Sequence, residues 1–324
     1  MKYTCIVRTI AAFLIYASFQ SSLPAGETSD KKKWWPSEWG PDDQRGAANR
    51  ITPQKVLEAS KLITGGKVYS LGRVYEQGMP LFGDRHYSLS IVGSPTGGPL
   101  GDNHLVWHDE MFSGEIGQIG TQFDGLGHVG KRVGDQDVFY NGVTRSEMKG
   151  GYGLEKLGVE HAGSFFTRGV LVDVAAYRGL ERLKKGDVIT VSDLEGALKN
   201  QDLSIGEGDI VLIRTGHGKL WMKDNEAYNS GAPGIGIEAA KYLSEQKIAL
   251  VGSDTWCVEV VPGPDPKQAF NVHQHLLVHN GIYLLENLDL ESLAQEQVHE
   301  FAFVFSPLLL KGATGSPGNP IAVR

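Results

Sequence analysis

The sequence predicts a mixed α/β or α+β fold in a single domain, because strand and helix patterns alternate along one chain without an internal repeat or interior linker. Short continuous apolar runs at 170–174 and 210–213 lie between polar turns, as buried strands do. Amphipathic stretches with a helical period lie at 53–63 and 237–246. With 324 residues and 41% hydrophobic content, the chain can bury a large core.

The N-terminus has the layout of a secretory signal peptide. Lys2 and Arg8 precede a short apolar run at 10–19, and small or polar residues follow up to Ala25, where cleavage is expected. The run is too short to span a membrane stably, and an uncleaved anchor is the alternative. We therefore expect residues 1–25 to be a signal peptide and the mature protein to be secreted or periplasmic, without stable membrane insertion.

The rest of the chain is expected to form a polar segment, 26–37, and one folded domain, 38–324. The net charge of −7 becomes two units more negative when the signal peptide, with its two cations, is removed. No cluster of Lys and Arg marks a phosphate-binding surface, so we expect a small-molecule partner and no nucleic acid.

The first expected element of the domain is a helix. Thr52 provides a hydroxyl cap, Pro53 suits the first helical position, and the glycines at 65–66 are expected to end the helix. A strand is expected at 67–74.

The middle of the domain is expected to hold strands and one helix. From 80 to 130 the chain is rich in Gly, Asp and His with short apolar pieces, which predicts strands joined by functional loops. The runs at 170–174 and 210–213 are the predicted buried strands. Between them, Ser192 and Glu195 predict a capping box for a short helix.

The last third of the chain continues the alternation. The helix at 237–246 leads into a predicted strand at 248–251, and 282–285 and 301–305 predict further strands. The apolar pattern continues at 308–310 toward the C-terminus.

A first candidate for chemistry is the glycine-rich stretch 117–128, which we expect to form a tight loop close to a ligand. It contains Asp124 and His128, a carboxylate and an imidazole four residues apart. Such a pair suits a divalent cation, or a base with its orienting group. The alternative is a glycine-rich turn in which Asp124 binds its own backbone amides.

A second candidate is the stretch 270–281, which predicts a short helix ended by a glycine and followed by a strand that carries Glu286. His275 and His279 share one face of that helix, whereas His273 points elsewhere. All three histidines therefore cannot ligate one ion.

The first stretch resembles the metal-binding motif of the cyclase family, which includes bacterial kynurenine formamidases and isatin hydrolases. The family pattern is His-x-Gly-Thr-His-x-Asp-x-Pro-x-His, and this chain keeps its glycine, threonine, aspartate and last histidine at Gly120, Thr121, Asp124 and His128. Gln118 and Gln122 stand at the first two histidines, and Leu126 replaces the proline. The form Gly-Thr-Gln-x-Asp-Gly-Leu-x-His resembles a larger-chain branch of the family.

Further landmarks extend the resemblance over roughly residues 38–324. They occur in the same order as in the family. They are the segments 39–44, the Gly-Ala-Ala-Asn stretch that ends at Asn49, 251–255, 273–277 with Glu286 after it, and 315–322. The resemblance implies a swivelling β/β/α fold and a homo-oligomer, either a dimer or a tetramer.

The resemblance also implies a ligand set. Asp124 and His128 match family metal ligands, His273 matches the distal histidine, and Glu286 the distal carboxylate. The spacing from His273 to Glu286 is one residue longer than in the formamidases, so His275 is a rival.

Gln118 and Gln122 cannot be carried over as histidine ligands. A glutamine offers only a neutral carbonyl oxygen, so one position of a two-metal site is expected to be weakened or lost, and both residues stay candidates for weak ligands or the pocket wall. The remaining oxygen-rich set suits one divalent ion, manganese or zinc. Asp254, Thr255 and His108 are further candidates near the pocket.

The resemblance therefore predicts that the protein is a secreted metal-dependent hydrolase that acts on a small cyclic amide, lactone or formamide. The ion would activate a water and polarise a carbonyl, with Asp124 and His128 at the catalytic centre and His273 or His275 moving the proton. Two alternatives stay open. One is a lyase, isomerase or cyclase acting on a small carbonyl compound, and the other is an exported binding protein without catalysis.

Overall fold

The fold is built around a mixed sheet. In the computed structural model, which describes residues 33–93 and 96–324, nine strands form this sheet, and residues 34–324 make up one compact unit. The strands are β1 (Val68–Ser70), β6 (Gln122–Asp124), β9 (Phe165–Asp173), β11 (Ile210–Arg214), β13 (Leu250–Ser253), β14 (Tyr283–Glu286), β15 (Glu300–Phe305), β16 (Gly315–Pro317) and β17 (Ile321–Val323). Their order is β1-β17-β15-β9-β11-β13-β14-β6-β16.

The centre of the sheet is parallel and its edges are antiparallel. β9, β11, β13 and β14 run parallel to one another, whereas β15 pairs antiparallel to β9 and β6 pairs antiparallel to β14. Every residue of β11 and β13 is buried, as expected for strands covered on both faces. The predicted strands at 170–174 and 210–213 are confirmed, although β9 begins earlier, at Phe165, and ends at Asp173, so that Val174 opens α2 (Val174–Tyr177).

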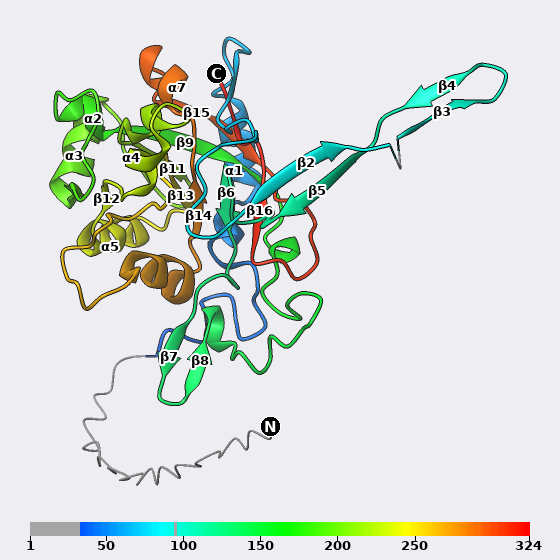
Figure 1. Cartoon of the computed structure of the whole chain (residues 1–324). Coiled ribbons are helices and arrows are strands. Elements are labelled where there is room, and N and C mark those ends of the chain that lie inside the picture. The colour runs from blue at the N-terminus through cyan, green and yellow to red at the C-terminus, as the bar shows by residue number, and fades with distance from the viewer. Residues whose placement is uncertain (1–32, 94–95) are drawn as a thin grey trace, which may run out of the picture. The chain divides into compact units, whose positions relative to one another are not determined.

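Helices cover the sheet, which confirms the predicted mixed fold class (Figure 1). The α-helices are α1 (Pro53–Ser60), α2 (Val174–Tyr177), α3 (Val191–Asn200), α4 (Asn225–Asn229), α5 (Ile237–Glu245), α6 (Asn271–His273) and α7 (Glu291–Gln295). Short 3-10 helices lie at Gly46–Arg50, Tyr140–Gly142, Val159–His161 and His217–Leu220, and a π-helical segment, Gln274–His279, continues α6. None of the helices in the part described has the length and apolar character needed to cross a membrane.

A two-stranded arm leaves the body of the fold, with β2 (Tyr87–Ile91) paired to β5 (Glu110–Gly114) and, further out, β3 (Gly97–Leu100) paired to β4 (Leu105–Trp107) (Figure 1). Two more short ladders join β7 (Lys131–Val133) to β8 (Gln136–Val138) and β10 (Val188–Ile189) to β12 (Gly234–Ile235). The prediction of strands joined by loops between 80 and 130 is confirmed.

The first helix begins as predicted but ends earlier. The Thr52 side chain accepts a hydrogen bond from Lys55 N at 3.3 Å and Pro53 opens α1. The helix stops at Ser60 because the chain then turns, with Leu62 N bonded to Ala59 O. The strand expected at 67–74 is limited to β1, since only these residues pair with β17.

The predicted capping box is wrong in position. Thr190, not Ser192, caps α3: its hydroxyl accepts from Asp193 N, and the Asp193 carboxylate accepts from Thr190 N at 2.8 Å. Two overlapping pairs in the sequence fit the motif, and the chain enters the helix directly from β10, which selects the earlier one. The C-terminal strands lie at β16 and β17, while 308–310 belongs to no strand.

Candidate metal centre

Strand pairing brings three polar side chains to one face of the sheet. In β6, Gln122 and Asp124 are two residues apart and share a face, while Phe123 between them is buried in the hydrophobic core. Glu286 on β14 lies directly opposite Gln122 in the antiparallel register. The stretch predicted as a glycine-rich loop thus contains a buried strand, β6. This strand places Asp124 on the face of the sheet that also carries Gln122 and Glu286.

The ligating atoms of Asp124, His273 and Glu286 lie within 4.8 Å of one another, and all three side chains are buried. His273 Nε2 is 3.8 Å from Asp124 Oδ2 and 3.3 Å from Glu286 Oε1. Both of these carboxylate oxygens are buried without a hydrogen-bond partner. Because an unpaired buried carboxylate oxygen is costly, the pair points to a cation between them.

The two glutamines hold the outer oxygens of these carboxylates. Gln122 Nε2 donates to Glu286 Oε2 at 2.7 Å, and Gln118 Nε2 donates weakly to Asp124 Oδ1 at 3.4 Å. Each amide therefore contacts one oxygen of its carboxylate. The other oxygen, Oδ2 of Asp124 or Oε1 of Glu286, faces His273. This role could not be read from the motif.

Glu259 is the site residue that the sequence reasoning missed. It is buried, it follows the strand β13 by six residues, and its Oε1 accepts hydrogen bonds from His273 N at 3.0 Å and from His273 Nδ1. This contact aims Nε2 into the cluster, in the manner of carboxylates behind metal-bound histidines. An acidic residue inside the apolar run 256–261 is the signal that could have found it.

The electrostatics agree with a cation at this point. Burial acts to lower the pKa of His273, but its hydrogen bond to Glu259 and the nearby negative charge of Glu286 raise it to about 10. Burial and the nearby Asp124 charge raise the pKa of Glu286. A proton on His273 thus balances the carboxylates, and a divalent ion at the same point would replace it. Two carboxylate oxygens and an imidazole backed by a carboxylate fit such an ion.

His128 lies at the rim of the cluster. Its Nε2 is 3.9 Å from Asp124 Oδ2, and its side chain keeps 25% exposure. A turn closed by His128 N to Gly125 O at 3.0 Å places it there. His128 therefore lies beside the three converging donors and is open to the cavity.

A cavity of about 260 Å³ opens over the cluster. Its aromatic walls are Phe82 stacked on Trp256, with ring centroids 4.4 Å apart and planes 14° apart, and Phe270 edge-on to His273. Arg85 and Cys257 also line it. Burial raises the pKa of the Cys257 thiol, which agrees with an inert side chain.

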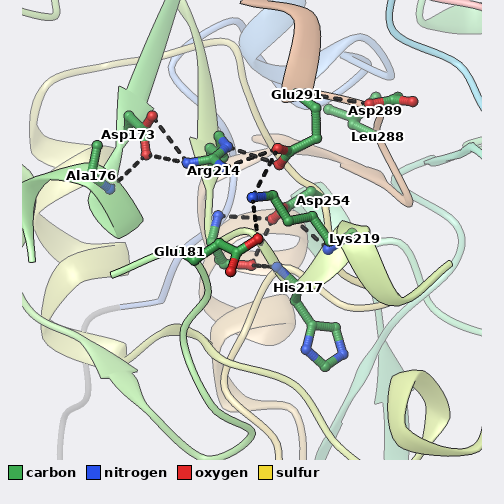
Figure 2. Close-up of polar contacts among 12 residues, drawn as sticks. Asp173, Ala176, Glu181, Arg214, His217, Lys219, Asp254, Leu288, Asp289 and Glu291 are labelled. Carbon is green, nitrogen blue, oxygen red and sulfur yellow. Dashed lines mark hydrogen bonds and ion pairs between the residues drawn. The ribbon is translucent and has the colours of Figure 1, made fainter. Parts of the chain in front are cut away.

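Asp254 and Thr255 do not line this cavity. Asp254 Oδ1 accepts from Thr215 N at 2.9 Å and from Thr215 Oγ1 at 2.7 Å, beside the ion pairs of Arg214 and Lys219 (Figure 2). Thr255 Oγ1 donates to the carbonyl of Cys257. Both side chains therefore form hydrogen bonds within or between the turns that follow the strands, as polar residues at strand ends commonly do.

His275 and His108 also lie outside the cavity. His275 Nε2 is 2.9 Å from Ser244 Oγ on α5, and its ring is 6.1 Å from that of His279, so the predicted shared face of these two is confirmed. The helix turns His273 toward Asp124 and His275 toward Ser244. His108 is exposed on the arm, between β4 and β5.

The fold and the cluster define an α/β protein with a candidate metal centre in an aromatic cavity. A family model described as "Putative cyclase" matches residues 69–260. The chain therefore belongs to the cyclase family, as its motifs predict.

Solved structures agree with this assignment. A protein described as a novel cyclase is 36% identical, with 88% of this chain and 96% of that one covered and a TM-score of 0.78. Isatin hydrolase A from Ralstonia solanacearum is 21% identical, with 84% and 97% covered and a TM-score of 0.60. The enzyme of that name from Labrenzia aggregata, bound to benzyl benzoate, is 20% identical, with 79% and 93% covered and a TM-score of 0.58. The two isatin hydrolases share the fold, and no curated protein matches the chain.

Proposed function

We propose that this protein is a metal-dependent hydrolase of small cyclic amides, lactones or formamides. The observation that carries the proposal is the convergence of Asp124, Glu286 and His273 in a cavity, with two carboxylate oxygens unpaired. A divalent ion, zinc or manganese, held by these donors would lower the pKa of a water and polarise a substrate carbonyl. The isatin hydrolase fold of two solved structures supports this reaction class.

The chain's own residues would orient the reactants and move the proton. Glu259 fixes the His273 ring, and the two glutamines fix the carboxylates. The stacked Phe82 and Trp256 form a wall suited to a flat substrate. His128 is the partly exposed imidazole beside the cluster, so we assign proton transfer to it rather than to His273 or His275.

The test is metal content together with turnover. Wild-type protein, Asp124→Ala and the exposed control Asp109→Ala are dialysed against a weak chelator, reloaded with zinc or manganese, and measured by elemental analysis. We expect one ion per chain in wild type and control and none in Asp124→Ala. Isatin, an aryl formamide and a lactone are then assayed in water enriched in oxygen-18. An active Asp124→Ala protein, or product without solvent oxygen, would contradict hydrolysis at this site.

We also propose that the protein is exported, secreted or periplasmic, on the basis of the N-terminal pattern at 1–25, which lies outside the residues described. N-terminal sequencing of the protein from its native host tests this. A start near residue 26 is expected, and an intact Met1 would contradict cleavage.

We propose in addition that the protein is a homo-oligomer, a dimer or a tetramer. One face of the β2–β5 ladder carries Leu89, Ile91 and Phe112, all at least 41% exposed, while Ser88 and Ser90 lie on the other face. A two-stranded ribbon is marginal in water by itself, so its apolar face supports packing on a second copy.

A further inference from the structure

Arg85 lies in the wall of the cavity above the candidate metal centre. Its guanidinium carbon is 5.4 Å from the centroid of the Phe82 ring, and its Nη1 is 3.5 Å from Phe82 O, at the limit of a hydrogen bond. Arg85 also lines the adjoining hollow beside Gln118 and Gln122. Among residues 33–93 and 96–324, no carboxylate lies within ion-pair distance of Arg85. Apart from this long contact, its donors are therefore available to a ligand.

The charges of the cavity single out this side chain. Asp124 and Glu286 are the carboxylates that line it, and their two negative charges are balanced when a divalent ion is bound. His273, as a ligand, is neutral. Glu259, bonded to His273, adds a third negative charge, and the guanidinium of Arg85, the cationic side chain that lines the cavity, offsets it in the loaded site.

The geometry is that of a planar anion site. A guanidinium stacked on an aromatic face keeps its edge N–H groups free, and this fork binds a carboxylate through two parallel hydrogen bonds. Phe82 contacts both Arg85 and Trp256, and these three side chains line the same cavity as the carboxylate cluster, so one small flat molecule can reach both ends.

We propose that the cavity takes a flat substrate that bears a carboxylate, which Arg85 binds while the scissile carbonyl faces Asp124, Glu286 and His273. The proposal deepens the hydrolase function and rests on it for the scissile bond. It makes Arg85 the residue that selects an anionic amide or lactone over a neutral one.

The test compares two probes of equal shape, 4-carbamoylbenzoate, which carries an amide and a carboxylate, and the neutral terephthalamide. Binding to manganese-loaded protein is measured by calorimetry for wild type, Arg85→Met, Arg85→Lys and the control Arg145→Met, which removes an exposed guanidinium on the β7–β8 side. We expect wild type and Arg145→Met to prefer the anion at least tenfold, Arg85→Met to lose that preference with unchanged affinity for the neutral probe, and Arg85→Lys to keep part of it.

Four results would overturn the proposal. The first is equal affinity of wild type for both probes, and the second is no binding of either. The third is an equal loss for both probes in Arg85→Met. The last is an anion preference that survives in Arg85→Met and disappears after chelation, because the carboxylate would then bind the metal. Since binding needs no turnover, an anion preference in a protein that hydrolyses nothing would reject the hydrolase function alone.

Discussion

The amide of Gln122 donates a 2.7 Å hydrogen bond to Glu286 Oε2 across the pair of β6 and β14. The residue that stands where the cyclase pattern has a histidine thus holds a carboxylate whose other oxygen, Oε1, is free. At this position the chain therefore holds Glu286 through an amide hydrogen bond, where the family pattern has an imidazole.

Replacing Gln122 by leucine should therefore weaken metal binding without removing a ligand. Supporting contacts of this kind are worth about 10–100-fold in metal affinity. Competition with a chromophoric chelator measures the change, with Gln136→Leu on β8 as an exposed control. An unchanged metal affinity would show that Glu286 needs no such support.

Glu259→Gln should lower metal affinity by a similar factor of about 10–100, because the neutral amide orients the His273 ring less firmly. Thermal unfolding of the metal-free protein serves as a second readout, and Glu245→Gln is the exposed control. A large fall in thermal stability with normal metal affinity would assign Glu259 to folding and not to His273.

The ion pair of Arg214 with Asp173 should be important for stability (Figure 2). Asp173 is buried and also caps α2 through Ala176 N, so Arg214→Met leaves a buried charge unpaired, which costs about 3–5 kcal/mol. Lys219→Met removes a more exposed partner of Glu181 and should cost under about 1 kcal/mol. Urea unfolding compares the two, and equal effects would contradict the burial argument.

Asp193 should make stability depend on acidity. Burial acts to raise its pKa, but hydrogen bonds from Arg178 and Thr190 lower it to about 2 from 3.8. A depressed folded pKa stabilises the protein above pH 4, and this contribution is lost as the pH falls from about 4 to 2. Asp193→Asn should cost about 1 kcal/mol at pH 7, and the difference from wild type should shrink below pH 4 in urea unfolding. A difference that is the same at every pH would reject the assignment.

The arm should control the oligomeric state. Leu89→Lys places a charge on its apolar face, whereas Ser90→Lys places the same charge on the opposite face. Light scattering after gel filtration should give monomers for Leu89→Lys and the wild-type oligomer for Ser90→Lys. A wild-type monomer, or a Leu89→Lys oligomer, would contradict the interface.

The sequence by itself determined the family and the fold class, and through the family resemblance it pointed to Asp124 and Glu286, with His273 and His275 as rival histidines. The resemblance rests on local patterns: an Asp in a motif of fixed spacing, a histidine before a Leu-Leu pair, and a carboxylate at the end of an apolar strand. The shared face of Gln122 and Asp124 was not predicted, because the stretch that holds them was expected to be a loop and forms strand β6.

Only the tertiary structure decided how these residues are supported and which candidates lie elsewhere. The contact from Gln122 to Glu286 spans 164 residues, and its existence depends on the register of β6 against β14. Glu259 reaches His273 through a loop, and the direction of one helical turn sends His273 to the site and His275 to Ser244. Such contacts depend on how distant elements pack, because residues far apart in sequence carry no local spacing that records their distance in space.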